Sequence, residues 1–204
     1  MKKLLQGLKI FLPLILFQGV VLGCASISDI KINYQLPIKK PQLEGKGVVL
    51  TISDIRHDRE ILTPIAKKEL KNFSGGLSLS VSQPNQTGYV VGIFEMKRIL
   101  SEVFKKRLEN EGLEVRQDSK CRLDVEIALI EFLIDIVDRN WVVKMAYEAR
   151  LNVDGKTAVT RKIGGEAERL RLVGTGSLDT VLSEIFTDLV NRLDFVSFFD
   201  GYTD

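Results

Sequence analysis

Hydrophobic residues recur along the chain with two different periods, and these periods predict two helices and a set of strands. Over residues 94–110 and 178–193 apolar side chains return every three or four positions, the spacing of an amphipathic helix. The first stripe contains Met96, Ile99, Leu100, Val103, Phe104 and Leu108, and the second contains Val181, Leu182, Ile185, Leu189 and Leu193. Gly112 and Ser177 stand where a C-cap and an N-cap are expected.

Strands are predicted where apolar and polar residues alternate or where β-branched residues run together. Residues 47–52 form such a run, and residues 77–81 and 89–91 fit the two arms of a hairpin. A short helix over residues 61–70 would begin at Thr63-Pro64. The longest alternation, over residues 141–153, predicts a half-buried strand that runs antiparallel to its neighbour at 123–137.

Two places in this sheet require an irregularity. Residues 123–129 and 130–136 alternate in opposite phases, so we expect a bulge or sharp bend near residues 128–130.

At the second place, a two-residue turn at Asp154-Gly155 would put lysines on the apolar face of the next strand. A three-residue loop with Gly155 as the bulge residue places Val159 and Ile163 there instead, so we predict the longer loop.

These elements together predict the α+β class. We expect a two-layer sandwich of a mainly antiparallel sheet, with the two amphipathic helices on one face.

The first 24 residues have the order of a bacterial lipoprotein signal. Lys2, Lys3 and Lys9 precede an apolar stretch over residues 10–21, which is too short to span a bilayer but fits the h-region of a signal peptide. The stretch ends in Val21-Leu22-Gly23-Cys24, which resembles a lipobox.

That resemblance implies cleavage between Gly23 and Cys24 and lipidation of Cys24, and Ala25 after the cysteine resembles outer-membrane sorting. We therefore divide the chain into a signal peptide (1–23), a lipidated N-terminus and tether (24–46) and a single periplasmic domain (47–204).

Composition narrows the classes of function. The chain has 204 residues, of which 45% are hydrophobic and 27% charged, values typical of a globular protein. Three of its 29 basic residues precede Cys24, which leaves 26 basic groups against 27 acidic ones and argues against a nucleic-acid partner. Two cysteines exclude a disulfide scaffold and a cysteine zinc site.

Candidate chemistry is sparse. The loop at 54–60 holds the only histidine, His57, which could act as a base or metal ligand, but its charges alternate in sign as in a solvated loop. Gly174-Thr175-Gly176-Ser177 could hold an anion at a helix start, although ordinary capping explains it as well. We predict no catalytic residue, no metal site and no cofactor.

Two features favour binding over catalysis, and each has an alternative within the chain itself. Phe195, Phe198, Phe199 and Tyr202 could anchor an interface or could fold back onto the core. Residues 127–137 are apolar on both strand faces apart from Glu131 and Asp135, so either residues 61–93 or a partner, including a second copy of the chain, covers the second face.

The order of elements resembles that of the YajG family of bacterial lipoproteins. The resemblance lies in the lipobox, in the strand and turn of residues 48–56, in the helix of residues 99–112, in the strand pair around Trp141 and Asp154-Gly155, and in the closing helix of residues 178–193. Residues 61–93 are longer than the corresponding segment of the family. The resemblance implies no catalytic residue and no functional residue beyond the lipidated Cys24.

The leading hypothesis is a non-enzymatic binding or envelope-assembly module. It would be anchored through its lipid in the outer membrane, face the periplasm and bind an envelope protein or a second copy of itself. The alternative is an auxiliary lipoprotein of an envelope transport system.

Overall fold

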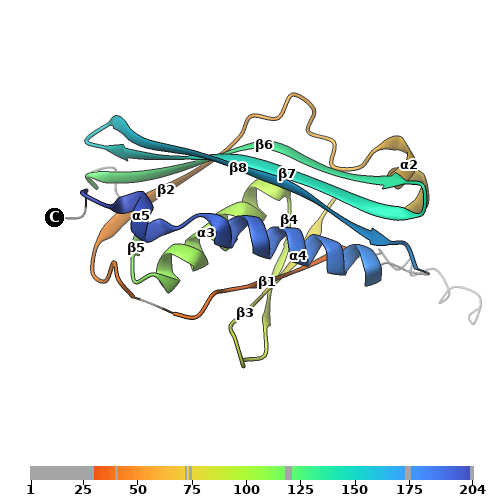
Figure 1. The fold of residues 1–204 in the computed structure, drawn as a ribbon, viewed down its shortest axis with the longest axis horizontal. Helices are drawn as coiled ribbons and strands as arrows, with labels where there is room; N and C mark the ends of the chain where they lie inside the picture. Colours follow the sequence, from red (N-terminus) through yellow and green to blue (C-terminus); the bar gives the residue numbers. More distant parts are fainter. Residues whose placement is uncertain are drawn as a thin grey trace, which may run out of the picture.

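The computed structural model describes residues 30–39, 41–71, 73, 75–117, 121–172 and 176–202. It contains two mixed sheets, and its two long helices lie between them (Figure 1). Gly23 and Cys24 lie outside the described residues. The larger sheet has the order β5-β2-β6-β7-β8, and the smaller has the order β1-β3-β4. The elements are β1 (Ile30–Gln35), β2 (Gly47–Asp54), α2 (Pro64–Glu69), β3 (Leu77–Ser82), β4 (Tyr89–Phe94), α3 (Met96–Asn110), β5 (Glu114–Arg116), β6 (Leu123–Val137), β7 (Asn140–Val153), β8 (Lys156–Leu170), α4 (Gly176–Arg192) and α5 (Phe195–Phe199).

The predicted sheet with two amphipathic helices is confirmed, but the sheets are mixed rather than mainly antiparallel. β6, β7 and β8 are joined by tight turns and pair antiparallel, whereas β2 pairs parallel with both β5 and β6. The physical reason is that β2 reaches these partners through a long crossover that contains α3, and a crossover returns the chain in the same direction. The periods of single strands carry no information on this pairing.

The small sheet adds a layer that the predicted two-layer sandwich lacks. α4 contacts β7 and β8 of the large sheet and also contacts β1 of the small one. Residues 30–35, which we placed in the tether, form β1 and pair parallel with β3. Ile30, Ile32 and Tyr34 are completely buried, so this part of the chain belongs to the folded body.

The free edge of β1 is closed by a row of polar side chains on α4. These side chains recur every four residues, which places them on one face of the helix. Their partners are alternate main-chain groups on the side of β1 that faces away from β3. The amides of Lys31, Asn33 and Gln35 donate to Asp179 (3.0 Å), Ser183 (2.9 Å) and Thr187 (3.2 Å), and Asn191 donates to the carbonyl of Gln35 (2.9 Å).

Both irregularities expected in the large sheet are present, one of them in a different place. The register of β6 against β7 shifts between Leu129 and Glu131, which confirms the predicted bulge. The predicted three-residue loop after β7 is wrong, because Asp154 and Gly155 form a two-residue turn with positive φ of 50° and 75°. The extra residue lies further along β8, opposite residues 151–152, and it still turns Val159 and Ile163 toward the core.

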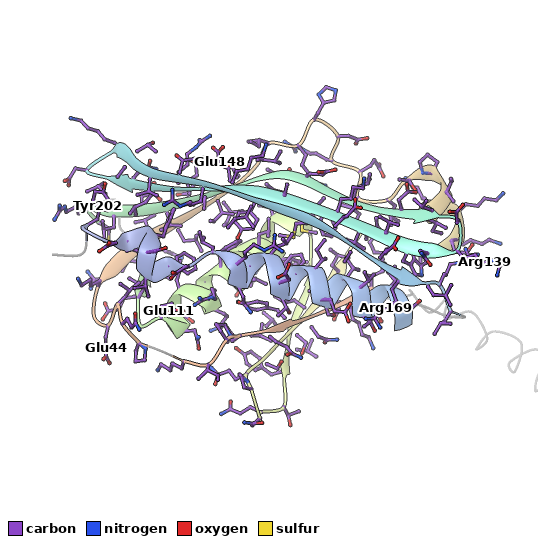
Figure 2. The ribbon with its side chains drawn as sticks, in the orientation of Figure 1. Glu44, Glu111, Arg139, Glu148, Arg169 and Tyr202 are labelled. Carbon is purple, nitrogen blue, oxygen red and sulfur yellow. The ribbon has the colours of Figure 1, made fainter. Side chains whose placement is uncertain are left out.

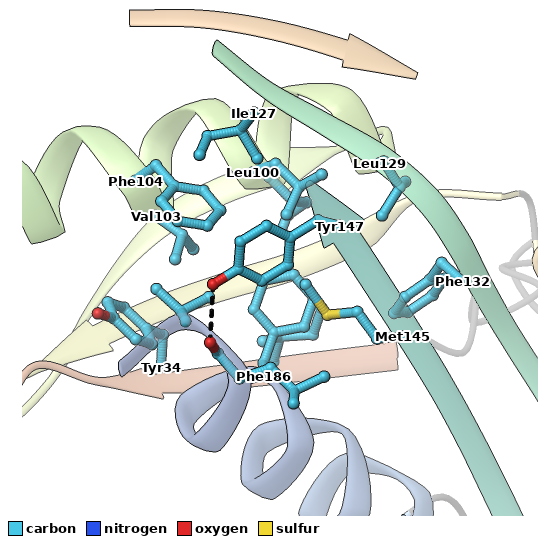
Figure 3. Close-up of a cluster of buried hydrophobic side chains, with 14 of the residues drawn as sticks. Tyr34, Leu100, Val103, Phe104, Ile127, Leu129, Phe132, Met145, Tyr147 and Phe186 are labelled. Atoms are coloured by element: carbon cyan, nitrogen blue, oxygen red, sulfur yellow. Dashed lines mark hydrogen bonds between the residues drawn. The ribbon is translucent and has the colours of Figure 1, made fainter. Parts of the chain in front are cut away.

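The centre of the core joins the sheet to α4 through Tyr147 (Figure 3). Its ring packs edge-on against Phe104 of α3 at 5.2 Å, and its hydroxyl donates to the carbonyl of Leu189 at 2.8 Å. That carbonyl belongs to the last turn of α4, where carbonyls lack a helical donor. Burial raises the pKa of Tyr147, so its hydroxyl stays a neutral donor.

We predict that Tyr147→Phe lowers the free energy of unfolding by about 1 kcal/mol, because the Leu189 carbonyl is left without this donor. Urea denaturation followed by circular dichroism measures the change, with Tyr202→Phe as a partly exposed control. An equal effect of the two substitutions would show that the buried hydrogen bond contributes nothing specific.

Candidate functional site

The segment that follows β2 is held by a buried ion pair. Arg56 donates to both carboxylate oxygens of Asp54, at 2.9 and 2.8 Å, and to the carbonyl of Phe132 in β6 at 3.3 Å. The side chains of Arg56 and Asp54 are only 5% and 14% exposed. The hydrogen bonds from Arg56 hold the pKa of the Asp54 carboxyl below its ordinary value. The pair is therefore a structural clamp between β2 and the bulged half of β6.

The remaining candidates for chemistry do not assemble into a catalytic site. His57 is exposed, and no group of three metal-ligating side chains occurs among the residues that the structure describes. Gly174 and Thr175 lie outside these residues. Gly176 begins α4, and Ser177 uses its hydroxyl to accept the amide of Leu172 at 3.3 Å.

The aromatic tail follows the second of its two alternatives. Phe195, Phe198 and Phe199 are at most 1% exposed and pack against one another, with ring centroids 5.8–6.2 Å apart. The guanidinium of Arg107 lies 5.3 Å from the Phe195 ring and ties α3 to this cluster. These rings are part of the core and present no surface to a partner, while Tyr202 is half-buried at their border.

Residues 61–63 lie along the edge of β6 beyond the end of β2. Thr63 donates its amide to the carbonyl of Ile134, and Ile134 donates to the carbonyl of Ile61. This segment therefore extends the sheet sideways instead of lying across its outer face. On that face Leu133 is half-buried and Val137 is 49% exposed, while Val142 is buried.

The larger sheet has an open edge along part of β2. β5 pairs only with residues 47–49, and no strand of the described chain continues along residues 50–54 on that side. The amide of Ile55 donates to Leu129 in β6, so by alternation the amides of Leu50 and Ile52 point away from β6, toward the open side.

A groove runs along this open edge, with a volume of about 710 Å³. One wall consists of Leu50, Thr51 and Ile52, and the other of Ile93 and Phe94 at the end of β4 together with the first turn of α3. Ile93 is 58% exposed. A second hollow continues the groove past Ile52 toward the Asp54–Arg56 pair. The result is an elongated, partly apolar channel between the edges of two sheets.

Basic side chains predominate along the rim of the groove. Lys97 and Arg98 belong to the first turn of α3, and the Arg98 guanidinium lies 4.7 Å from the Phe94 ring. Arg59 lines the continuation of the groove. Asp54 and Glu60 are paired with Arg56 and Lys67, which leaves Glu95 as the opposing charge. The groove therefore favours an extended ligand that carries both apolar and acidic groups.

The sequence analysis missed this groove because its walls come from residues far apart in the chain. The available signal is the short stretch Leu113-Glu114-Val115 after the helix, which is too short to pair along the whole strand at 47–52. Nothing in the sequence places this stretch beside that strand.

A smaller cleft lies between β3, β4 and the end of α3. In this cleft Lys106 pairs with Glu109, and the amide nitrogen of Asn110 donates to the carbonyl of Pro37, while the buried amide oxygen of Asn110 has no partner among the described residues.

Several solved structures of bacterial proteins match this chain to different degrees. Protein XCC0632 of Xanthomonas campestris, from the DUF330 family, is 16% identical, with a TM-score of 0.55 over 83% of this chain and 92% of its own. The hypothetical protein CT253 of Chlamydia trachomatis is 11% identical, with a TM-score of 0.45 over 78% and 98% of the two chains. Lipoprotein GNA1162 of Neisseria meningitidis is 11% identical, with a TM-score of 0.30 over 72% and 99%.

Of these three similarities, the one to XCC0632 supports the fold, and at 16% identity it supports the fold alone. No protein-family model and no curated protein sequence matches the chain. Among the described residues, no helix has the length and apolar character needed to cross a bilayer.

We predict that acid destabilises the protein partly through Asp54. Because the pKa of this carboxyl is lower in the folded state than in the unfolded one, its contribution is full above about pH 4 and is lost as the pH falls through the folded-state value. Urea unfolding between pH 5 and pH 3 should therefore show a steeper loss of stability in the wild type than in Asp54→Asn. The exposed Asp58→Asn, in the same loop, is the control, and parallel pH curves for wild type and Asp54→Asn would contradict the prediction.

Proposed function

We propose that the protein is a lipid-anchored, non-enzymatic binding module of the bacterial outer membrane. In this proposal it faces the periplasm and holds an extended segment of an envelope protein along the open edge of β2. The observation that carries the proposal is the groove between that edge and the start of α3, because an unpaired strand edge binds an extended peptide through main-chain hydrogen bonds.

Two of the other sheet edges, those of β1 and β8, are protected, whereas the edge strand β4 lies across the groove from β2. The edge of β1 is closed by the polar row on α4. The long edge strand β8 carries exposed charges such as Arg161, Lys162 and Glu166, which discourage pairing with another chain. β2 has neither protection along residues 50–54 and is flanked by apolar side chains instead.

The proposed lipid anchor is supported by the sequence around Cys24 and by the position of β1 in the fold. Val21-Leu22-Gly23-Cys24 resembles a lipobox, and acylation on two groups holds a protein firmly in a membrane. Ala25 after the cysteine resembles the sorting signal of outer-membrane lipoproteins and supports this location. β1, which begins at Ile30, is built into the core, so a lipid on Cys24 would tether the folded body through only a few residues.

The anchor is tested by membrane fractionation of the wild type beside Cys24→Ser, with mass spectrometry of the N-terminus. We expect acylated Cys24 in outer-membrane fractions and loss of both acylation and membrane association in the variant. A wild type that is soluble and carries no lipid would contradict the proposed anchor.

The groove is tested with a displayed library of random twelve-residue peptides, selected on the folded domain and then titrated individually. We expect selected peptides to alternate apolar residues and to carry acidic ones, and to change the NMR signals of the Leu50 and Ile52 amides. Ile93→Asp should weaken their binding at least about tenfold, as expected for an apolar contact at the centre of an interface.

Val90→Asp is the matched control for this experiment, because Val90 lies on the same strand, is 72% exposed and does not line the groove. Equal loss of binding in the two variants, or signal changes away from β2, would contradict binding along this edge.

A further inference from the structure

The start of β1 fixes which end of the molecule lies nearest to a lipid on Cys24. Cys24 precedes Ile30 by six positions, a distance that an extended chain spans with at most about 20 Å. The amide of Lys31 donates to Asp179 in the first turn of α4, so β1 begins beside the N-terminal end of that helix. Figure 1 shows this end of α4 lying near the β6–β7 turn and the end of β8.

Four large apolar side chains are exposed at this same end. They are Ile65 (61% exposed), Val137 (49%), Leu170 (54%) and Leu172 (63%), here called the anchor-side patch.

Pairings place these side chains together. Val137 and Leu170 both flank Asn140 across neighbouring strands of the large sheet. Glu69 of α2 bonds Arg171 at 3.0 Å, and Ile65 precedes Glu69 by one helical turn on the same face. Residues from α2, β6 and β8 thus converge on one end of the molecule.

Charged groups border the patch. Arg139 lies at the tip of the β6–β7 turn beside the exposed Asp138, and Arg169 lies near the start of α4 on the end of β8, where it pairs with Glu184 (Figure 2). Long basic side chains keep their charge among headgroups while their stems lie along apolar surface. A surface of this composition suits the boundary between water and lipid.

We infer that the anchor-side patch rests on the surface of the bilayer that holds the lipid of Cys24. This inference depends on the proposed lipid anchor and adds an orientation to it. Isolated exposed apolar residues are common in soluble proteins, but here they gather where the tether holds the body within about 20 Å of the membrane. The long strands of the large sheet then run from the membrane surface outward, with the β7–β8 turn at the far end.

The test uses the full-length lipidated protein in vesicles of phosphatidylethanolamine and phosphatidylglycerol that contain a headgroup-quenching lipid. In a Cys121→Ser background, a fluorophore is placed on Arg139→Cys at the patch or on Lys156→Cys at the far turn. We expect the probe at position 139 to lose about half or more of its fluorescence, because it lies within about 10 Å of the headgroups. The probe at position 156, about 40 Å away along β7, should keep its intensity.

A second variant separates contact through the patch from simple tethering. Val137→Asp combined with Leu172→Asp changes only exposed side chains, so the fold is retained and circular dichroism verifies it. If the patch rests on lipid, this pair of changes reduces quenching at position 139. Unchanged quenching, or equal quenching at positions 139 and 156 without the changes, overturns the orientation.

Vesicle flotation distinguishes this failure from failure of the anchor. Protein that floats with the vesicles but shows no patch-dependent quenching keeps the lipid anchor and loses the orientation. Protein that does not float contradicts both.

Discussion

α4 is the element on which the rest of the structure depends, because it must satisfy two different surfaces at once. Its apolar face packs against β7, β8 and α3, and Tyr147 of β7 bonds its last turn. Its polar row bonds the main chain of β1. Both sheets therefore meet on one helix, and the small sheet would lose the cover of its edge if that helix moved.

The sheet edges of the molecule differ in how they are protected. An unpaired strand edge attracts other strands, so folded proteins usually cover or charge it. Here a helix covers the edge of β1 and charges protect β8, while residues 50–54 of β2 face a groove instead. The Asp54–Arg56 clamp ties the end of that strand to β6, which keeps the groove wall in place without a neighbouring strand.

Local patterns predicted a large part of the fold. The stripes of α3 and α4, the start of α2 at Thr63 and the bulge in β6 follow from the spacing of neighbouring residues. The turn at Asp154-Gly155 shows the limit of this reasoning. The burial phase of β8 was right while the position of the extra residue was wrong, because a bulge at either place produces the same phase further along the strand.

By itself the sequence determined the two helices, the buried face of β7 and a lipobox-like motif before Cys24, since each depends on residues adjacent in the chain. Only the tertiary structure decided that β2 pairs parallel, that Phe195, Phe198 and Phe199 fill the core, and that β1 belongs to the folded body. It also decided which edge stays open, because that depends on how far β5 extends beside β2. These outcomes depend on contacts between residues far apart in sequence, and no local period encodes such contacts.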